Sequence, residues 1–411
     1  MGKQPGQLSA RALQASLRTT TERLAAELVA PHSVQPDWSP AEWRIASAVA
    51  TMHGIAPLLA SRLRWGGPER WGQYLREQCV LASRRHERIR ELLDLMDVQL
   101  RAADVAAVAL KGVALYEAGL YGPGERPMAD VDVLVHEADL ERASKVLQTL
   151  GFEESLRLWK NRLFTPGDGG ERWRPQQQGD HPIKVELHER ICEMLPLKIV
   201  DITASVYPAK PAAGLGSYSG HSALMAHLLL HAAGSIVDRA VRLVQLHDIA
   251  LLAGCMTEPD WERALASDPG HAQVCWWAYP PLQLTARYYP ERIPAVALDR
   301  ARAHCPWVLR RICERQRLSD VSLSFPWIQA FPALAWTRSW RETLEYAVSR
   351  VVREPEQTSM RELASRIEPD LSAAERRWLG SSQAVRILRW LLSRPARPLT
   401  MRAVRSALGE L

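Results

Sequence analysis

The sequence predicts an α+β fold, in which a small mixed sheet lies between two helical regions. Three observations lead to this prediction. Apolar residues recur at helical spacing through residues 40–100 and again from about residue 221, whereas the stretch between them contains short apolar runs of strand length. We therefore expect a helical N-terminal region over residues 1–100, a mixed core over residues 101–215 and a helical C-terminal region over residues 216–411.

The helical pattern of the N-terminal region has a defined start signal. Ser39-Pro40-Ala41-Glu42 puts a serine at the N-cap, a proline at the first helical position and a glutamate three residues after the serine, which is the pattern of a capping box. A later helix over residues 74–101 places Leu92, Met96 and Leu100 on one face. No catalytic motif occurs here, so we interpret this region as a helical packing layer.

The middle region alternates between strand and helix patterns. VAAVAL at 105–110 predicts a buried strand, and a short helix is expected after Lys111-Gly112. VDVLV at 131–135 predicts a second strand, and the helix that follows over 138–149 should end at Gly151. Further strands are expected within residues 152–159, around residues 163–165 and at 183–187, and residues 167–182 have the composition of a loop.

Helices are expected to resume near residue 221. The following stretch predicts two helices joined near Gly234, and Thr257-Glu258-Pro259-Asp260 predicts the start of another. Beyond residue 270 we expect the tryptophans to pack in the core rather than to stack on bases; they are Trp276, Trp277, Trp307, Trp327 and Trp336. Residues 382–411 are basic and amphipathic, which indicates either a surface helix or a contact for an acidic partner.

The composition limits the class of protein. Hydrophobic residues make up 47% and charged residues 24% of 411 residues, which excludes a disordered, collagen-like or disulfide-stapled chain. The sequence lacks both an uncharged apolar run of membrane-spanning length and an apolar leader, so we expect a cytoplasmic protein without a membrane partner. Its six cysteines contain no CxxC pair and should be reduced and mostly buried. We attribute the net charge of +6 mainly to the source genome's base composition rather than to nucleic-acid binding.

Three acidic residues lie on predicted strands. Asp130 and Asp132 flank Val131, and because alternate residues of a strand face the same side, both carboxylates should project together. Glu186 lies in the strand at 183–187 between apolar neighbours, where a buried carboxylate needs a cation. Three convergent carboxylates suit a hard divalent ion such as Mg²⁺. The alternative is that the two aspartates lie on an exposed strand face, and the order of strand, glycine turn, helix and acidic strand favours the metal site.

Several polar residues near these strands have two interpretations. His188 should share the face of Glu186, where it would orient a carboxylate or make a structural hydrogen bond. His227 and His231 have the i, i+4 spacing of a metal-binding pair, but the glutamate of an H-E-x-x-H motif is absent. We therefore favour hydrogen bonds where the helices meet the core. Arg242 and Asp248 are candidates for contacts with a substrate.

The stretch AVALKGVALYEAGLYGPGERPMADVDVLVHEADLERASKVLQTLGF resembles the nucleotidyltransferase superfamily, and more narrowly its branch of uncharacterised bacterial nucleotidyltransferases. That branch has an L-K-G element, an R-x-x-x-D-h-D-h-h-V element and an h-[D/E]-h-H strand. The matching residues here are Leu110-Lys111-Gly112, then Arg126 with Asp130 and Asp132, and then Glu186-Leu187-His188. The clear resemblance covers residues 105–190, and a weaker one continues through residues 227–252.

The resemblance implies that the core is a nucleotidyltransferase catalytic core. It implies Mg²⁺, with Mn²⁺ as an alternative ion, and an NTP as co-substrate; Asp130, Asp132 and Glu186 would be the catalytic residues and metal ligands. Lys111, Gly112 and Arg126 are candidates for binding the NTP. Most of the superfamily has Gly-Ser where this chain has Lys111-Gly112, so Lys111 either contacts a phosphate or pairs with an acid, and Arg126 either clamps a phosphate or forms a structural salt bridge.

The expected reaction moves a nucleoside monophosphate from the NTP to a hydroxyl or phosphate acceptor and releases pyrophosphate. We favour a small molecule, a sugar or a peptide as the acceptor, because the helical regions would enclose a pocket beside the sheet. Transfer to RNA or tRNA is the alternative within enzymes, and a non-catalytic NTP-binding regulatory module is the alternative outside them.

Overall fold

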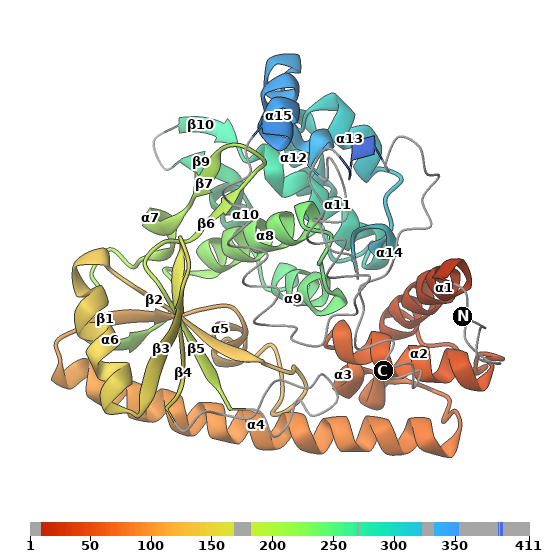
Figure 1. Ribbon diagram of the computed structural model, residues 1–411, viewed down its shortest axis with the longest axis horizontal. Helices are drawn as coiled ribbons and strands as arrows, with labels where there is room; N and C mark the ends of the chain where they lie inside the picture. The colour runs from red at the N-terminus through yellow and green to blue at the C-terminus, as the bar shows by residue number, and fades with distance from the viewer. Residues whose placement is uncertain are drawn as a thin grey trace.

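The structure of the chain is a computed structural model that describes residues 10–167, 182–268, 271–322 and 333–352, together with residues 385, 387 and 388. A six-stranded mixed sheet and a larger assembly of helices lie side by side, and one long helix runs below both (Figure 1). This arrangement confirms the predicted α+β class. The basic stretch 382–411 and Trp327 lie outside the described residues, apart from those three positions.

The N-terminal part of the chain is helical, as predicted. Its helices are α1 (Ala10–Val29), α2 (Pro40–Met52), α3 (Ala56–Arg62) and α4 (Glu69–Ala102). The capping box at the start of α2 is confirmed: Ser39 Oγ accepts a hydrogen bond from the Glu42 N–H, and the Glu42 carboxylate accepts one from the Ser39 N–H at 2.8 Å. Helix α4 is 34 residues long and begins five residues before the predicted start.

The sheet has the strand order β3-β4-β5-β2-β1-β8. Its strands are β1 (Ala106–Ala109), β2 (Asp130–Val135), β3 (Phe152–Arg157), β4 (Asn161–Pro166), β5 (Lys184–His188) and β8 (Gly214–Gly216). Strand β2 pairs parallel to β5, and this register sets Asp130 opposite Lys184 and Asp132 opposite Glu186. Between the strands lie α5 (Gly112–Glu117), the short 3₁₀ turn η1 (Glu137–Asp139) and α6 (Leu140–Thr149). Gly151, two residues after the end of α6, has a positive φ of 85°, as expected for a glycine that terminates a helix.

Alternation along β2 separates a packed face from a polar face. Val131, Val133 and Val135 belong to a buried cluster with residues of α4 and α6, so these two helices cover one face of the sheet. Asp130 and Asp132 therefore face the opposite side, toward the helical assembly. The same two-residue period puts Glu186 on the polar face of β5.

Four short elements after β5 were not predicted. They are the hairpin of β6 (Cys192–Met194) with β7 (Ile199–Asp201), the helix α7 (Thr203–Val206) and the edge strand β8. Each extends over only three or four residues, which is too short for a periodic pattern to emerge from the sequence.

The C-terminal part of the described chain is mainly helical. It contains α8 (His221–Val237), α9 (Leu243–Ala253), α10 (Glu258–Leu265), the strand pair β9 (Ala266–Asp268) and β10 (His271–Val274), η3 (Trp276–Ala278), α11 (Tyr279–Tyr288), α12 (Ala295–His304), α13 (Trp307–Cys313), α14 (Leu318–Val321), η5 (Leu334–Trp336) and α15 (Trp340–Val352). The predicted helix start at Thr257 is confirmed, and Thr257 forms a capping box with Asp260 there. The predicted junction at Gly234 is wrong, because this glycine lies inside α8 and the two helices are joined at residues 238–242. A side chain at position 234 would collide with Glu193, which explains a glycine inside the helix.

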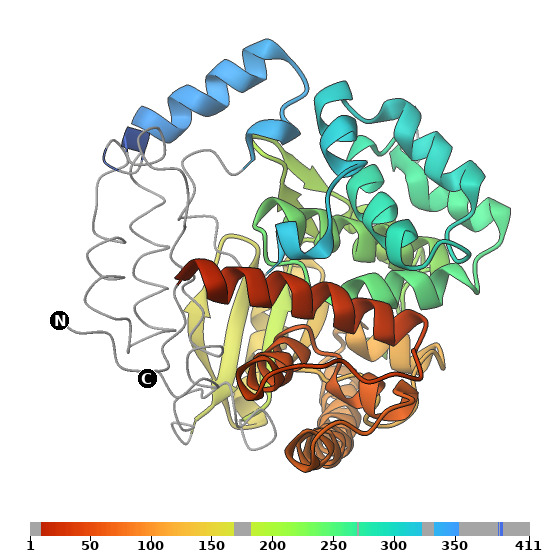
Figure 2. The same ribbon diagram turned by 90° about the vertical axis from the view of Figure 1, so that its right-hand side faces the viewer.

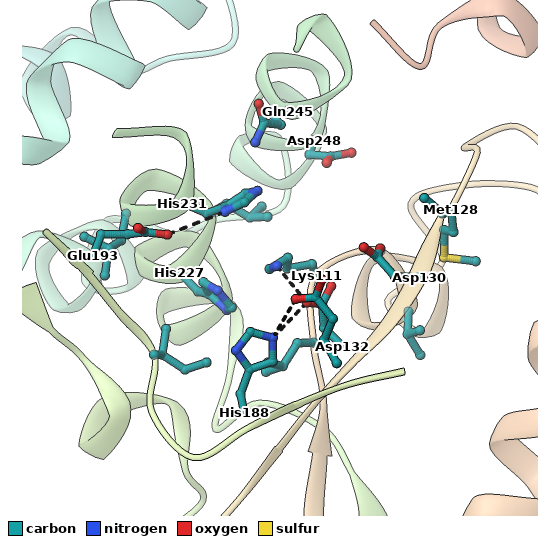
Figure 3. Close-up of a pocket in the computed structure, with 18 of the residues that line it drawn as sticks. Lys111, Met128, Asp130, Asp132, His188, Glu193, His227, His231, Gln245 and Asp248 are labelled. Carbon is teal, nitrogen blue, oxygen red and sulfur yellow. Dashed lines mark hydrogen bonds and ion pairs between the residues drawn. The ribbon is translucent and has the colours of Figure 1, made fainter. Parts of the chain in front are cut away.

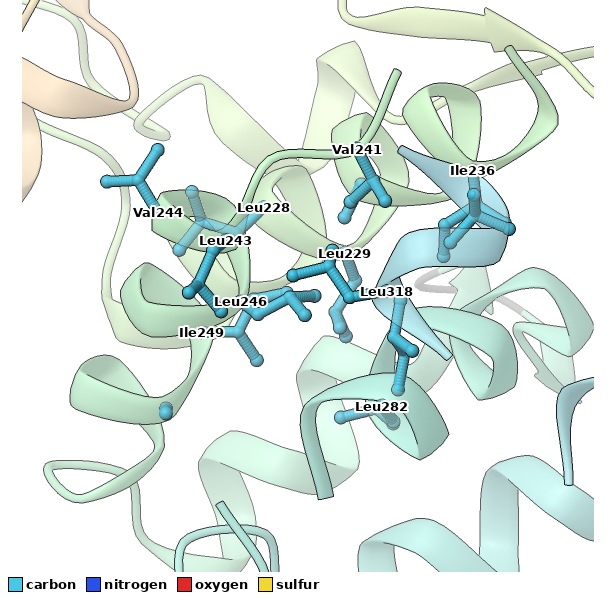
Figure 4. Packing of buried hydrophobic residues seen from close by; sticks show 14 of the residues in the cluster. Leu228, Leu229, Ile236, Val241, Leu243, Val244, Leu246, Ile249, Leu282 and Leu318 are labelled. Atoms are coloured by element: carbon cyan, nitrogen blue, oxygen red, sulfur yellow. The ribbon is translucent and has the colours of Figure 1, made fainter. Parts of the chain in front are cut away.

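One hydrophobic core joins the first and last parts of the chain. The cluster contains residues of α1–α3 together with residues of α8–α14, and Figure 4 shows its centre around Leu229, Leu246 and Leu282. Figure 2 shows α1 lying beside the C-terminal helices, which the contacts between α1 and α14 confirm. Sequence order therefore does not follow packing order, and the boundaries at residues 100 and 215 stay a prediction.

The tryptophans divide between core and surface. Trp277 and Trp336 are buried, and Trp276 packs edge-on against Trp336 with ring centroids 6.1 Å apart. Trp307 was expected in the core, but 62% of it is exposed, and the guanidinium of Arg311 lies over its ring. All six cysteines are free thiols, and four of them are buried, as predicted. Within the described residues, every helix is too short or too polar to span a membrane.

Candidate active site

A polar cavity lies between the open face of the sheet and helices α8 and α9 (Figure 3). The sheet contributes Asp130 and Asp132 from β2 and Glu186 and His188 from β5. The helices contribute His227 and His231 from α8, and Gln245 and Asp248 from α9; Lys111, Gly112 and Arg126 line it as well. All six residues that the sequence singled out for catalysis and binding therefore lie around one cavity.

Asp132 is the centre of the hydrogen-bond network in this cavity. Its Oδ1 accepts from Lys111 Nζ at 2.8 Å and lies 2.9 Å from His188 Nε2. The same imidazole nitrogen lies 3.5 Å from Glu186 Oε2, which also accepts from the Asn161 amide at 2.6 Å. His188 thus bridges the acids of two strands, an arrangement that agrees with the structural hydrogen bond expected for it, and its orienting role stays a prediction.

The electrostatics of the cavity separate the three acids. Burial alone would raise the pKa of Asp132, but the Lys111 ammonium and the hydrogen bond from His188 outweigh it and hold this pKa well below its ordinary value. Burial alone would also raise the pKa of Glu186, but the hydrogen bond from His188 together with the charges of Lys111 and His188 outweighs it and lowers this pKa. Burial and the charges of Asp132 and Glu186 raise the pKa of Asp130 to about 6. Asp132 and Glu186 therefore ionise readily, whereas the surroundings of Asp130 disfavour its negative charge.

We expect Asp130→Asn to stabilise the metal-free protein. In the described part of the chain the Asp130 carboxylate has no hydrogen-bond partner, so the variant would remove a disfavoured charge and little else. A carboxyl whose pKa is raised from near 4 to about 6 in the folded state costs stability as pH rises through that interval, and the cost is complete above it. The free energy of unfolding should rise by roughly 1–3 kcal/mol at pH 7.5.

Urea titrations of wild type and Asp130→Asn at pH 4 and pH 7.5 measure this effect. The difference between the two proteins should be small at pH 4 and large at pH 7.5 in the presence of a chelator. A difference that is the same at both pH values would show that the gain has another source than the Asp130 charge.

Lys111 has an unusual backbone. Its φ of 47° and ψ of −112° lie in a region that residues other than glycine rarely adopt. The conformation turns the chain from β1 into α5 and directs the lysine side chain at Asp132. Of the two predicted contacts of Lys111, the structure contains the ion pair with Asp132. A contact of Lys111 with a phosphate stays a prediction.

Arg126 is buried and forms a bidentate pair with an acid of α9. Its Nε and Nη2 each donate to the Asp248 carboxylate at 2.8 Å, and Tyr121 donates to the same carboxylate at 2.6 Å. The predicted structural salt bridge exists, but its partner is Asp248 rather than the acids on the strands. Asp248, which was expected to face a substrate, is occupied by this pair, and phosphate binding by Arg126 stays a prediction.

Gly112 provides space for the Arg126 guanidinium. A Cβ at this position would lie 2.5 Å from Arg126 Nη1 and 2.9 Å from the Met128 sulfur, so no larger residue fits without displacing them. Packing against Arg126 and Met128 thus explains the glycine at this position, and binding of the NTP by Gly112 stays a prediction.

Arg85 has a role that the sequence did not reveal, whereas Arg242 was already a candidate for substrate contacts. Arg85 is buried and donates to the carbonyls of Met128 and Ala129, directly before β2. Arg242 lines the cavity beside Asp130, and its side chain is exposed there. The contact of Arg85 crosses 43 residues of sequence, so no local pattern indicates it.

The α8 histidines have polar neighbours where this helix meets the core, and His227 forms a hydrogen bond there. His227 Nδ1 lies 2.6 Å from the Tyr218 hydroxyl, and His231 faces Glu193, which Lys160 contacts at 2.8 Å. Among the described residues, the acids and histidines whose ligand atoms converge within 4.8 Å are Asp132, Glu186 and His188. This outcome agrees with the interpretation that we favoured for His227 and His231.

Comparison with known proteins supports the resemblance. The model of the family described as "Uncharacterised nucleotidyltransferase" matches residues 39–268, more than half of the chain. The chain belongs to this family. No curated protein and no solved structure matches the chain. The matched region extends from α2 to β9, so this nucleotidyltransferase family includes the helices α8 and α9 that close the cavity as well as the sheet.

The cavity of this nucleotidyltransferase family member suits a divalent metal. Asp132, Glu186 and His188 bring ligand atoms within 4.8 Å of one another, and Asp130 lines the same cavity without belonging to this group. Carboxylate oxygens are the donors that Mg²⁺ and Mn²⁺ prefer. Asp130 supplies the most direct sign, because a half-buried carboxylate without a hydrogen-bond partner in the described chain is a costly group that a cation would satisfy.

Proposed function

We propose that this chain is a cytoplasmic, metal-dependent nucleotidyltransferase that transfers a nucleoside monophosphate from an NTP to a hydroxyl or phosphate acceptor. The single observation that carries the proposal is the register of β2 and β5, which sets Asp132 opposite Glu186 with Asp130 on the same face of the sheet. Three carboxylates on adjacent strands, facing one polar cavity, are difficult to explain by stability alone.

Each acid has a role in the proposed reaction. Asp130 and Asp132 would hold Mg²⁺ or Mn²⁺ together with Glu186. When bound there, the metal would neutralise the triphosphate and stabilise charge on the attacking and leaving oxygens. The acceptor oxygen forms a bond to the α-phosphorus, and the bond from this phosphorus to the leaving pyrophosphate breaks. Glu186 would either complete this metal site or take the proton of a hydroxyl acceptor, and His188 Nε2, 3.5 Å from Glu186 Oε2, would help to orient its carboxylate in either role.

An acceptor screen tests the proposal. The purified chain, α-labelled NTPs and Mg²⁺ would be incubated with a cell extract separated into small-molecule, protein and RNA fractions. We expect label transfer and pyrophosphate release with at least one fraction, and we favour the small-molecule or peptide fractions. Binding of an NTP without transfer to any fraction would instead indicate a regulatory module.

The salt dependence of binding separates RNA from the other acceptors. An RNA complex should weaken steeply between low and moderate salt, because phosphate contacts release counterions.

Removal of the Lys111 ammonium should have opposite effects on metal and nucleotide. Because Lys111 contacts Asp132 at 2.8 Å, we expect Lys111→Met to bind Mn²⁺ alone at least as tightly as wild type. If the ammonium moves to the triphosphate when both substrates bind, NTP affinity should fall roughly ten- to a hundredfold, as for the loss of a charged hydrogen bond. Separate calorimetric titrations with Mn²⁺ and with an NTP measure the two effects. Unchanged NTP affinity would remove Lys111 from the nucleotide-binding residues.

A further inference from the structure

A partly buried chain of hydrogen bonds links the backbone of Lys111 to a histidine of α8. The Lys111 N–H donates to the Tyr218 hydroxyl at 3.1 Å, and this hydroxyl lies 2.6 Å from His227 Nδ1. Tyr218 lies between β8 and α8, so the chain crosses from the sheet to the helical assembly. It begins at the residue with the strained backbone and ends at the cavity wall.

The direction of each hydrogen bond follows from the number of protons and acceptors on the three groups. A backbone N–H can only donate, so the Tyr218 oxygen accepts from Lys111. Among the described residues, the Tyr218 hydroxyl proton is paired only if it is donated to His227 Nδ1. We therefore infer that Nδ1 accepts this proton and that the imidazole hydrogen is on Nε2. Burial and the nearby Lys111 charge hold the pKa of His227 well below its ordinary value, so the ring is neutral and this tautomer is fixed by its partner.

The fixed tautomer gives the cavity a neutral donor. His227 lines the cavity and projects from α8 toward Asp132 and His188 (Figure 3). Its Nε2 has no hydrogen-bond partner among the described residues, so the N–H is available to a ligand. A neutral donor beside the Lys111 ammonium contacts an anionic oxygen without adding a second positive charge next to the first.

We propose that Tyr218 and His227 form a positioning relay, in which Tyr218 both holds the Lys111 backbone and fixes His227 as an Nε2–H donor to a triphosphate oxygen of the NTP. The inference rests on the proposed function for the identity of the ligand, but the relay itself does not. It adds two residues to the site that lie outside the strand motifs and that touch no acid directly.

The His227 tautomer can be measured without assaying any reaction. Long-range ¹H–¹⁵N spectra of histidine-labelled protein distinguish the two neutral tautomers, and the His227→Gln variant identifies the His227 signal. We expect the Nε2–H tautomer in wild type and a mixture in Tyr218→Phe. Tyr207→Phe is the matched control, because the Tyr207 hydroxyl donates to the Ala106 carbonyl on the same sheet and does not line the cavity. A wild-type protein with the proton on Nδ1 would overturn the relay.

The phosphate contact is tested with inorganic triphosphate and excess Mg²⁺, a probe that has no base or sugar. We expect His227→Phe to bind it about tenfold more weakly than wild type, as for a lost hydrogen bond to a charged group. His227→Gln, whose amide can donate near the Nε2 position, should keep most of the affinity. If His227 had only a structural role, both variants would be less stable in urea but His227→Gln would not bind triphosphate more tightly than His227→Phe. Equal affinity of wild type and His227→Phe would overturn the contact.

Failure of the proposed function has a different signature. If wild type binds no triphosphate at any Mg²⁺ concentration, both the nucleotide-binding function and the phosphate contact are refuted, whereas the tautomer spectrum still decides the relay. If wild type binds and His227→Phe binds equally well, only the phosphate contact is refuted.

Discussion

Replacing Asp132 by asparagine should reduce pyrophosphate release by about a thousandfold or more while the chain stays folded. Asp132 is the acid that both Lys111 and His188 contact, and it lies opposite Glu186 across two parallel strands. An asparagine keeps the shape but not the charge, so it would bind a divalent metal weakly. Metal stabilisation of the transferring phosphoryl group contributes several kcal/mol, and each 1.4 kcal/mol corresponds to tenfold in rate.

The matched control for this variant is Glu154→Gln. Glu154 is an acid on β3 of the same sheet, but it pairs with the exposed Arg157 and lies outside the cavity. Its activity should equal that of wild type. Circular dichroism and urea titration check that Asp132→Asn is folded. Wild-type pyrophosphate release by a folded Asp132→Asn protein would refute the assignment of the acids.

Local signals predicted much of this fold correctly. The capping box at Ser39 and the helix start at Thr257 were predicted because each signal depends on residues only a few positions apart. The acids of β2 were placed on one face because strand alternation also acts over two residues. The identification of Glu186 as their neighbour relied on the family resemblance, since the parallel pairing of β2 with β5 spans more than fifty residues of sequence.

Partners that are distant in the sequence limited the prediction. Arg126 was expected near the strand acids because it lies four residues before Asp130, yet its partner Asp248 is 122 residues away. The helical pattern around Arg85 does not indicate its contact with the Met128 carbonyl in the loop before β2. Tyr218 carried no signal at all, because a single tyrosine after a short edge strand belongs to no periodic pattern. These contacts arise from tertiary packing, which one sequence does not encode at fixed spacing.

The buried pair of Arg126 and Asp248 should have the largest effect on stability. Only 9% of the Arg126 side chain and 1% of the Asp248 side chain are exposed, so neither charge is hydrated. Removing one partner leaves the other charged and buried, which costs about 3–5 kcal/mol. We expect Arg126→Met and Asp248→Asn each to lower the free energy of unfolding by that amount. Arg302→Met is the matched control, because the side chain of Arg302 in its pair with Glu314 is exposed to solvent and the pair should contribute little to stability.

The double variant Arg126→Met/Asp248→Asn distinguishes a lost salt bridge from lost packing. If the cost of each single variant is mainly an uncompensated charge, the double variant should be destabilised by less than the sum of the two, and a double-mutant cycle gives the coupling energy. Because the pair joins α9 to the loop that leads into β2, its loss should also loosen Asp130 and Asp132 relative to the helices. Urea titration measures the coupling, and additive single effects would show that the two charges do not depend on each other.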